Sequence, residues 1–98
     1  MNVKSKISIQ RICERYEVDR GFLLSISEMD LITVYEEDAE QYIAEDELPL
    51  VERMMRLHQD LGINHEGLHT IHHMLERMEG MQEEIRQLRN RLSRYEDW

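Results

Sequence analysis

The chain has 98 residues, of which 41% are hydrophobic, and its 21 acidic and 12 basic residues give a formal net charge of -9. This length fits one small domain, and an aromatic content of 6% leaves little material for a deep, enclosed active site, so a metabolic enzyme is not expected. No apolar run is long enough for a secretory signal or a membrane span, and the single cysteine, Cys13, has no partner for an internal disulfide. We therefore expect a cytoplasmic, non-enzymatic protein without a cofactor, in which Cys13 is a small core residue.

The negative charge is concentrated in the middle of the chain. Residues 1–33 contain five basic and five acidic residues, whereas residues 34–52 contain eight acidic residues and no basic one. This acidic strip repels the phosphates of nucleic acids and favours, through electrostatic steering, a basic protein surface. A solvated loop whose acids only keep the protein soluble is the simpler interpretation of the charge alone.

The first third of the chain predicts two short helices joined by a tight turn. Ser8 is placed to cap a helix over residues 8–16, in which four residues recur at helical spacing: Ile9, Ile12, Cys13 and Tyr16. Asp19 is placed to cap a second helix, whose inner face would consist of Phe22, Leu23, Ile26 and either Met29 or Leu31. Two such helices form a helix-turn-helix.

A small wing hairpin is predicted next. Residues 33–35 and 41–43 are rich in β-favouring side chains and flank an acidic tip at 36–40. A helical turn over residues 37–43 fits the same side chains, so this alternative stays open.

Two further helices complete the chain. Asp46 and Pro49 open a third helix that ends at Gly62. Its apolar face would consist of Leu50, Met54, Leu57 and Leu61. Asn64 caps a last helix over about residues 65–95, which is about 45 Å long if unbroken.

The last helix carries a heptad repeat. Its a positions are Ile71, Met78, Ile85 and Leu92, and its d positions are Met74, Met81, Leu88 and Tyr95. One small domain cannot cover so long a stripe, so we expect these residues to form a dimeric coiled coil, parallel or antiparallel. A single helix folded back onto its own domain is the alternative. The chain thus divides into a winged helix-turn-helix domain at 1–64 and a dimerisation helix at 65–98.

Four histidines near the start of the last helix form the one cluster that resembles a metal site: His65, His69, His72 and His73. Pairs four residues apart share a helical face, but no cysteine ligand accompanies them, and the heptad places them away from the dimer seam. We predict no specific metal site. Metal binding and a response to pH at about 6 to 7 remain alternatives.

The second half of the chain resembles a known family. Residues 50–68 read LVERMMRLHQDLGINHEGL, and residues 89–95 read RNRLSRY. The elements that match in order and spacing are Arg53, Arg56-Leu57, Asp60-Leu61, Gly67 and the closing Arg-x-Arg-Leu-Ser-Arg-aromatic run. They resemble the CbpM chaperone modulators, a family of MerR-like winged-helix proteins, and the resemblance extends more loosely back through residues 12–32.

This resemblance implies a mainly α protein with a MerR-like winged helix-turn-helix followed by a long coiled-coil helix. It also implies a cytoplasmic regulator that binds the J-domain of a DnaJ-like co-chaperone of the CbpA type and inhibits its activity. A J-domain presents a basic helix to its Hsp70 partner, and the acidic strip would cover that helix by charge complementarity. The candidate partner-binding residues are Glu36, Glu37, Asp38, Glu40, Glu45, Asp46 and Glu47.

The same scaffold allows an alternative, a MerR-type transcription regulator that binds DNA as a dimer. Its contacts would come from the basic residues Lys4, Lys6, Arg11, Arg15 and Arg20. The expected recognition helix over residues 19–30 has a single basic residue, Arg20, and the wing has none. Because phosphate contacts depend on lysine and arginine, we do not expect specific DNA binding.

Overall fold

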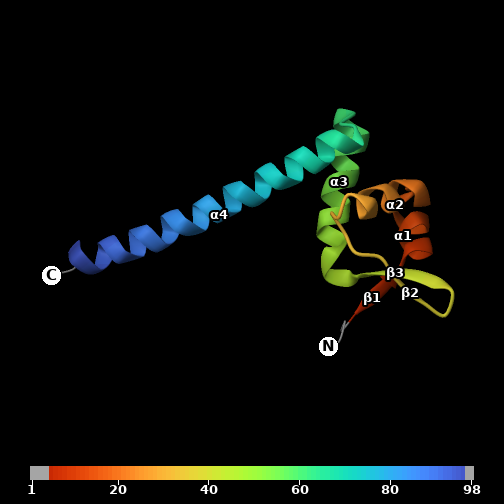
Figure 1. Cartoon of the computed structure of the whole chain (residues 1–98), viewed down its shortest axis with the longest axis horizontal. Coiled ribbons are helices and arrows are strands. Elements are labelled where there is room, and N and C mark those ends of the chain that lie inside the picture. The colour runs from red at the N-terminus through yellow and green to blue at the C-terminus, as the bar shows by residue number, and fades with distance from the viewer. Residues whose placement is uncertain (1–4, 97–98) are drawn as a thin grey trace.

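The computed structural model describes residues 5–96 and confirms a mainly α protein with a winged helix-turn-helix and a long C-terminal helix. Its elements in chain order are β1 (Lys6–Ser8), α1 (Ile9–Tyr16), α2 (Arg20–Glu28), β2 (Tyr35–Glu37), β3 (Glu40–Ala44), the 3-10 helix η1 (Glu45–Glu47), α3 (Leu48–Leu61) and α4 (His65–Glu96). The elements from β1 to α3 form a small domain, from which α4 extends (Figure 1).

The two helices of the helix-turn-helix begin where the sequence predicts. The Ser8 hydroxyl accepts a hydrogen bond of 3.1 Å from the backbone N–H of Arg11 and so caps α1. Asp19 occupies the equivalent position before α2, but its side chain makes no capping bond. Its backbone carbonyl accepts from the N–H of Phe22 instead, at 3.1 Å. Asp19 is therefore the N-cap residue of α2, as predicted, although it caps the helix without its side chain.

The wing is a three-stranded antiparallel sheet in the order β1-β3-β2, and its first strand was not predicted from the sequence. The tip is also shorter than predicted, because only Asp38 and Ala39 lie outside the strands, with φ values of 53° and 66°. Two consecutive left-handed residues make the tight turn that matches the twist of a hairpin. Three of the acids predicted at the tip are strand residues instead: Glu36, Glu37 and Glu40.

The third helix starts later than predicted and ends at Gly62 as predicted. Asp46 lies in η1, and α3 itself starts two residues later, with Pro49 in its first turn. The buried residues of α3 are Val51, Met54 and Met55, whereas Leu61 is 69% exposed and was wrongly placed on the inner face. Leu61 ends the helix, beyond the region where the other elements cover it. Gly62 then adopts φ 68°, which permits the turn into α4.

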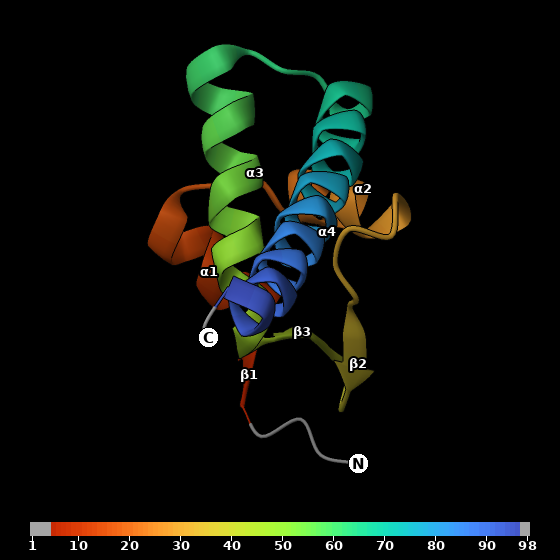
Figure 2. The ribbon, with the colours of Figure 1, turned by 90° about the vertical axis from the view of Figure 1, so that its left-hand side faces the viewer.

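The last helix is joined to the domain only at its beginning. The Asn64 side-chain oxygen accepts a hydrogen bond of 2.8 Å from the backbone N–H of Gly67, which confirms Asn64 as the cap. The first turns of α4 lie beside α3 and α2 (Figure 2). Among residues 65–96, Leu68 is the one buried side chain. The rest of the helix therefore leaves the domain without covering its core.

The core lies between the helices and the inner side of the sheet. Its buried hydrophobic residues are Ile9, Ile12, Phe22, Leu23, Ile26, Leu31, Ile32, Ile43, Val51, Met54, Met55 and Leu68. Cys13 packs against this core half-buried, and burial raises the pKa of its thiol. No helix within residues 5–96 combines the length and apolar composition needed to cross a membrane.

Candidate functional site

The acids of the wing divide between two faces of the sheet. Side chains alternate along a strand, and the registers pair Tyr35 with Tyr42 and Glu37 with Glu40. These four residues share the outer face with Lys6 of β1, whereas the inner face carries the buried Ile43. Glu36 follows the inner register opposite Gln41, near the end of the sheet. The predicted acidic strip is therefore not one continuous surface.

A lysine and a tyrosine organise the outer face of the wing. The Lys6 ammonium forms an ion pair with Glu37 and lies 4.6 Å from the centre of the Tyr42 ring. The Tyr42 hydroxyl donates a hydrogen bond of 2.9 Å to Oε1 of Glu40, and this bond is the main cause of the raised pKa of Tyr42. The face thus combines carboxylates with aromatic rings, and both groups attract cations.

The inner end of the wing lies against the start of α2. The guanidinium of Arg20 donates a hydrogen bond of 2.6 Å to the side-chain oxygen of Gln41. A shallow depression is lined there by Ser8, Gln10, Arg20, Glu36, Ala39, Glu40 and Gln41. Arg20, the single basic residue of the expected recognition helix, is therefore engaged by the wing.

The remaining candidate acids lie in η1, at the other end of β3. Strand β3, which spans about 13 Å from its first to its last residue, separates them from the tip. Glu45 and Asp46 are exposed, but Glu47 is half-buried and accepts a hydrogen bond of 3.2 Å from the backbone N–H of Thr33. Glu47 therefore fixes the loop before β2 and is a poor contact for a partner.

The basic residues of the DNA-binding alternative do not share one environment. Lys6 pairs with Glu37 on the wing, Arg20 contacts Gln41, and the Arg15 guanidinium lies 5.7 Å from the centre of the Tyr16 ring. Arg11 is exposed on α1, and Lys4 lies outside the described residues. Two of the four described bases, Lys6 and Arg20, are therefore engaged by side chains of the wing.

The histidine cluster divides into two groups. His65 stacks on His58 at 5.3 Å between ring centres, and Phe22 lies beside both rings. His69 and His73 approach each other at 3.1 Å between their Nε2 atoms. His72 lies 3.3 Å from a carboxylate oxygen of Glu76, a neighbour that was not predicted from the sequence. In the part of the chain that the structure describes, no three or more His, Cys, Asp or Glu side chains are arranged to hold a metal ion.

The heptad residues of α4 lie on an apolar stripe that the rest of the described chain, residues 5–64, leaves largely uncovered. Seven of the eight predicted residues are between 48% and 75% exposed: Met74, Met78, Met81, Ile85, Leu88, Leu92 and Tyr95. Ile71, nearest the domain, is half-buried. The alternative of a helix folded back onto its own domain is therefore wrong for the distal part, because α4 extends away from the domain (Figure 1).

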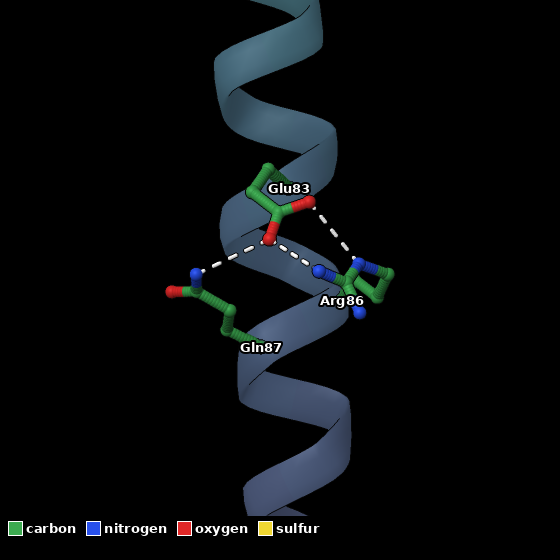
Figure 3. Close-up of polar contacts among 3 residues, drawn as sticks. All are labelled: Glu83, Arg86 and Gln87. Carbon is green, nitrogen blue, oxygen red and sulfur yellow. Dashed lines mark hydrogen bonds and ion pairs between the residues drawn. The ribbon is translucent and has the colours of Figure 1, made fainter.

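The opposite side of α4 is polar, and its side chains form hydrogen bonds with one another. Figure 3 shows Glu83 accepting hydrogen bonds from Arg86 and from Gln87. The Arg86 Nε bond to Glu83 is 3.1 Å and the Gln87 bond is 3.2 Å. This face suits solvent, in contrast to the apolar stripe.

A comparison with known protein families identifies the scaffold of this chain. Residues 7–90 match the family described as MerR HTH family regulatory protein, which is most of the chain. The chain belongs to this family. The match spans the wing, the helix-turn-helix and most of α4, so it confirms the MerR-like scaffold predicted from the sequence.

Two relatives are similar to this MerR-family chain over nearly its whole length. The chaperone modulatory protein CbpM of Pseudomonas entomophila strain L48 is 23% identical over 91 residues, which cover 92% of this chain and 90% of the relative. The protein of the same name from Pseudomonas putida strain F1 is 24% identical over 91 residues, which again cover 92% of this chain and 90% of the relative. The chain is thus a CbpM-like member of the MerR family, which confirms the predicted resemblance. No solved structure matches it.

Proposed function

We propose that this protein is a non-enzymatic, cytoplasmic chaperone modulator that binds the J-domain of a DnaJ-like co-chaperone and inhibits its activity. The single observation that carries the proposal is the chemistry of the wing. In a DNA-binding scaffold the wing would offer lysine or arginine to phosphates, but residues 35–47 have seven acids and no base, and the one basic residue of the wing, Lys6 of β1, is paired with Glu37. The names of the two relatives support a role in chaperone modulation.

Charge complementarity identifies the part of the J-domain that the wing would bind. Exposed carboxylates at Glu37, Asp38 and Glu40 attract the basic helix that a J-domain offers to its Hsp70 partner. A wing bound to that helix excludes Hsp70 by occupying the same surface. Glu45 and Asp46 would extend the attraction to a longer stretch of the helix, because they lie at the far end of β3.

The experiment is a calorimetric titration of the isolated J-domain at low and at moderate salt. The test variant combines Glu37→Lys, Asp38→Lys and Glu45→Lys. A matched control combines Glu28→Lys, Asp60→Lys and Glu79→Lys, which are also exposed and change the net charge equally. We expect the test variant to bind at least about tenfold more weakly and to lose most of the salt dependence, because long-range attraction depends on where the charges lie.

Equal binding by the wild type and the test variant would show that these acids are only solvated. If the control variant binds the J-domain as weakly as the test variant, the effect comes from the net charge of the protein and not from the position of these acids. Absence of binding by the wild type would reject the proposed function.

We also propose that the protein is a homodimer through the stripe on α4. An apolar surface of this length on one exposed helix is unfavourable in water. A second copy offers the same stripe, which lets both copies bury it.

DNA binding remains the second candidate, because the family match is to regulators with a helix-turn-helix. It would require Lys6 and Arg20 to leave Glu37 and Gln41, respectively. A sequence-selective mobility shift at nanomolar protein and physiological salt would favour this function over the chaperone role.

A further inference from the structure

The outer face of the wing already holds one cation. Lys6 starts from β1 and Glu37 lies on β2, with β3 between the two strands. The Lys6 side chain therefore crosses over β3 to reach its carboxylate, and on the way its ammonium lies 4.6 Å from the centre of the Tyr42 ring. A ring face and a carboxylate thus act on the same ammonium group.

This arrangement has the chemistry of a site for a lysine or arginine side chain. Aromatic ring faces attract cations, and a carboxylate adds a charge-assisted hydrogen bond. The Tyr42 hydroxyl donates to Glu40, which fixes the ring beside a second acid. Tyr35, directly opposite Tyr42 in the register, is 44% exposed and presents another ring on the same face.

We propose that this sheet face binds lysine or arginine side chains of the partner's basic helix on Tyr42 and Tyr35, and that Lys6 occupies this place in the free protein. The inference rests on the proposed function, since the basic helix is that of the J-domain. It adds that the tyrosines recognise the helix together with the acids, and that Lys6 is a built-in competitor.

The Lys6 contact is suited to being displaced. The side chains of Lys6 and Glu37 are 41% and 59% exposed, so water screens their ion pair, and exposed ion pairs stabilise a protein weakly. A helix with several cations can engage Glu37, Asp38 and Glu40 together, whereas Lys6 supplies a single charge. The basic helix therefore makes more ionic contacts with this face than Lys6 does, which lets it displace Lys6.

The test compares J-domain affinities by calorimetry for Lys6→Met, Tyr42→Leu and Tyr42→Phe. Lys6→Met keeps an apolar side chain and removes the competitor, so we expect binding to become about two- to fivefold tighter. Tyr42→Leu removes the ring and weakens binding by about the same factor, whereas Tyr42→Phe keeps the ring face and stays near the wild type.

Two matched controls separate this site from general effects. Arg11→Met changes the net charge as Lys6→Met does, but from exposed α1, and His73→Leu removes an exposed aromatic ring from α4 away from the apolar stripe. Neither should reproduce the effect of its counterpart. Circular dichroism verifies that the wing variants retain the wild-type fold.

The inference is overturned if Lys6→Met binds no more tightly than Arg11→Met, or if Tyr42→Leu binds like the wild type. In either case J-domain binding by the wild type would leave the proposed function intact. If the wild type does not bind the J-domain, the proposed function fails, and an octalysine peptide then probes the site by NMR. Shifts of the Tyr35 and Tyr42 ring signals that grow in Lys6→Met support the cation site, and their absence rejects it.

Discussion

The Tyr16 hydroxyl donates a hydrogen bond of 2.6 Å to Oε2 of Glu52 and so joins the end of α1 to α3. The two residues are 36 positions apart in sequence. This bond is the main cause of a raised pKa at Tyr16, with smaller contributions from burial and from the charge of Glu52. The ionised tyrosine would lose the bond and face a carboxylate, which explains the direction of the shift.

Stability should therefore fall in alkaline solution. The folded chain holds the Tyr16 proton more tightly than the unfolded chain, whose tyrosines titrate near 10.0. The stabilisation is complete below about pH 10 and is lost as pH rises through the higher pKa of the folded state. Tyr42, whose pKa is raised by its bond to Glu40, acts in the same direction.

Urea unfolding between about pH 8 and 11 measures this effect. We expect Tyr16→Phe to be less stable than the wild type at neutral pH but to lose less stability on going to high pH. Tyr95→Phe, which removes a hydroxyl remote from both bonds, serves as the control. A Tyr16→Phe curve parallel to that of the wild type would contradict the prediction.

Two glycines of α4 should respond to alanine in opposite ways. A Cβ at Gly67 would lie 2.6 Å from Cγ2 of Ile63 and 3.2 Å from Oδ1 of Asn64, so it would disturb the cap. A Cβ at Gly80 would meet nothing within 4 Å. Gly80→Ala should stabilise the exposed helix by about 0.5–1 kcal/mol, whereas Gly67→Ala should destabilise the protein. Thermal unfolding of both variants measures the difference, and equal shifts would show that the cap tolerates the methyl group.

Leu68 should be the residue on which docking of α4 depends. It is fully buried in the core, so Leu68→Ala should lower the free energy of unfolding by about 2–5 kcal/mol. Leu61→Ala is the matched control, because Leu61 is exposed at the end of α3. Urea titrations compare the two, and a similar small loss in both would show that α4 is not held through Leu68.

The stripe on α4 should hold two copies together. Ile85→Asp would place a charge in the seam of the proposed coiled coil, so we expect the dimer to dissociate. Gln87→Asp makes the same change of charge on the polar side of the helix and should leave the assembly intact. Light scattering at micromolar concentration should give twice 11.9 kDa for the wild type and for Gln87→Asp, but not for Ile85→Asp. A monomeric wild type would contradict the prediction.

Local patterns in the sequence were sufficient to predict the helices and to indicate the family. Ser8, Gly62 and Asn64 act on backbone groups within a few residues, so capping rules place them correctly. The heptad in α4 depends only on spacing along one helix. The matching elements from Arg53 to Gly67 likewise lie within one short segment, so the sequence alone is enough to indicate the CbpM-like relationship.

Contacts between distant segments were decided by the tertiary structure. Strand β1 has three residues and forms by pairing with β3, in which the partners Ile7 and Ile43 are 36 positions apart in sequence. No local sequence pattern therefore predicts this strand. That strand places Lys6 on the wing, and register alone assigns Glu37 to the outer face and Glu36 to the inner one. Composition could find the acidic strip, but a side chain's face depends on which strands pair, and pairing depends on the whole chain.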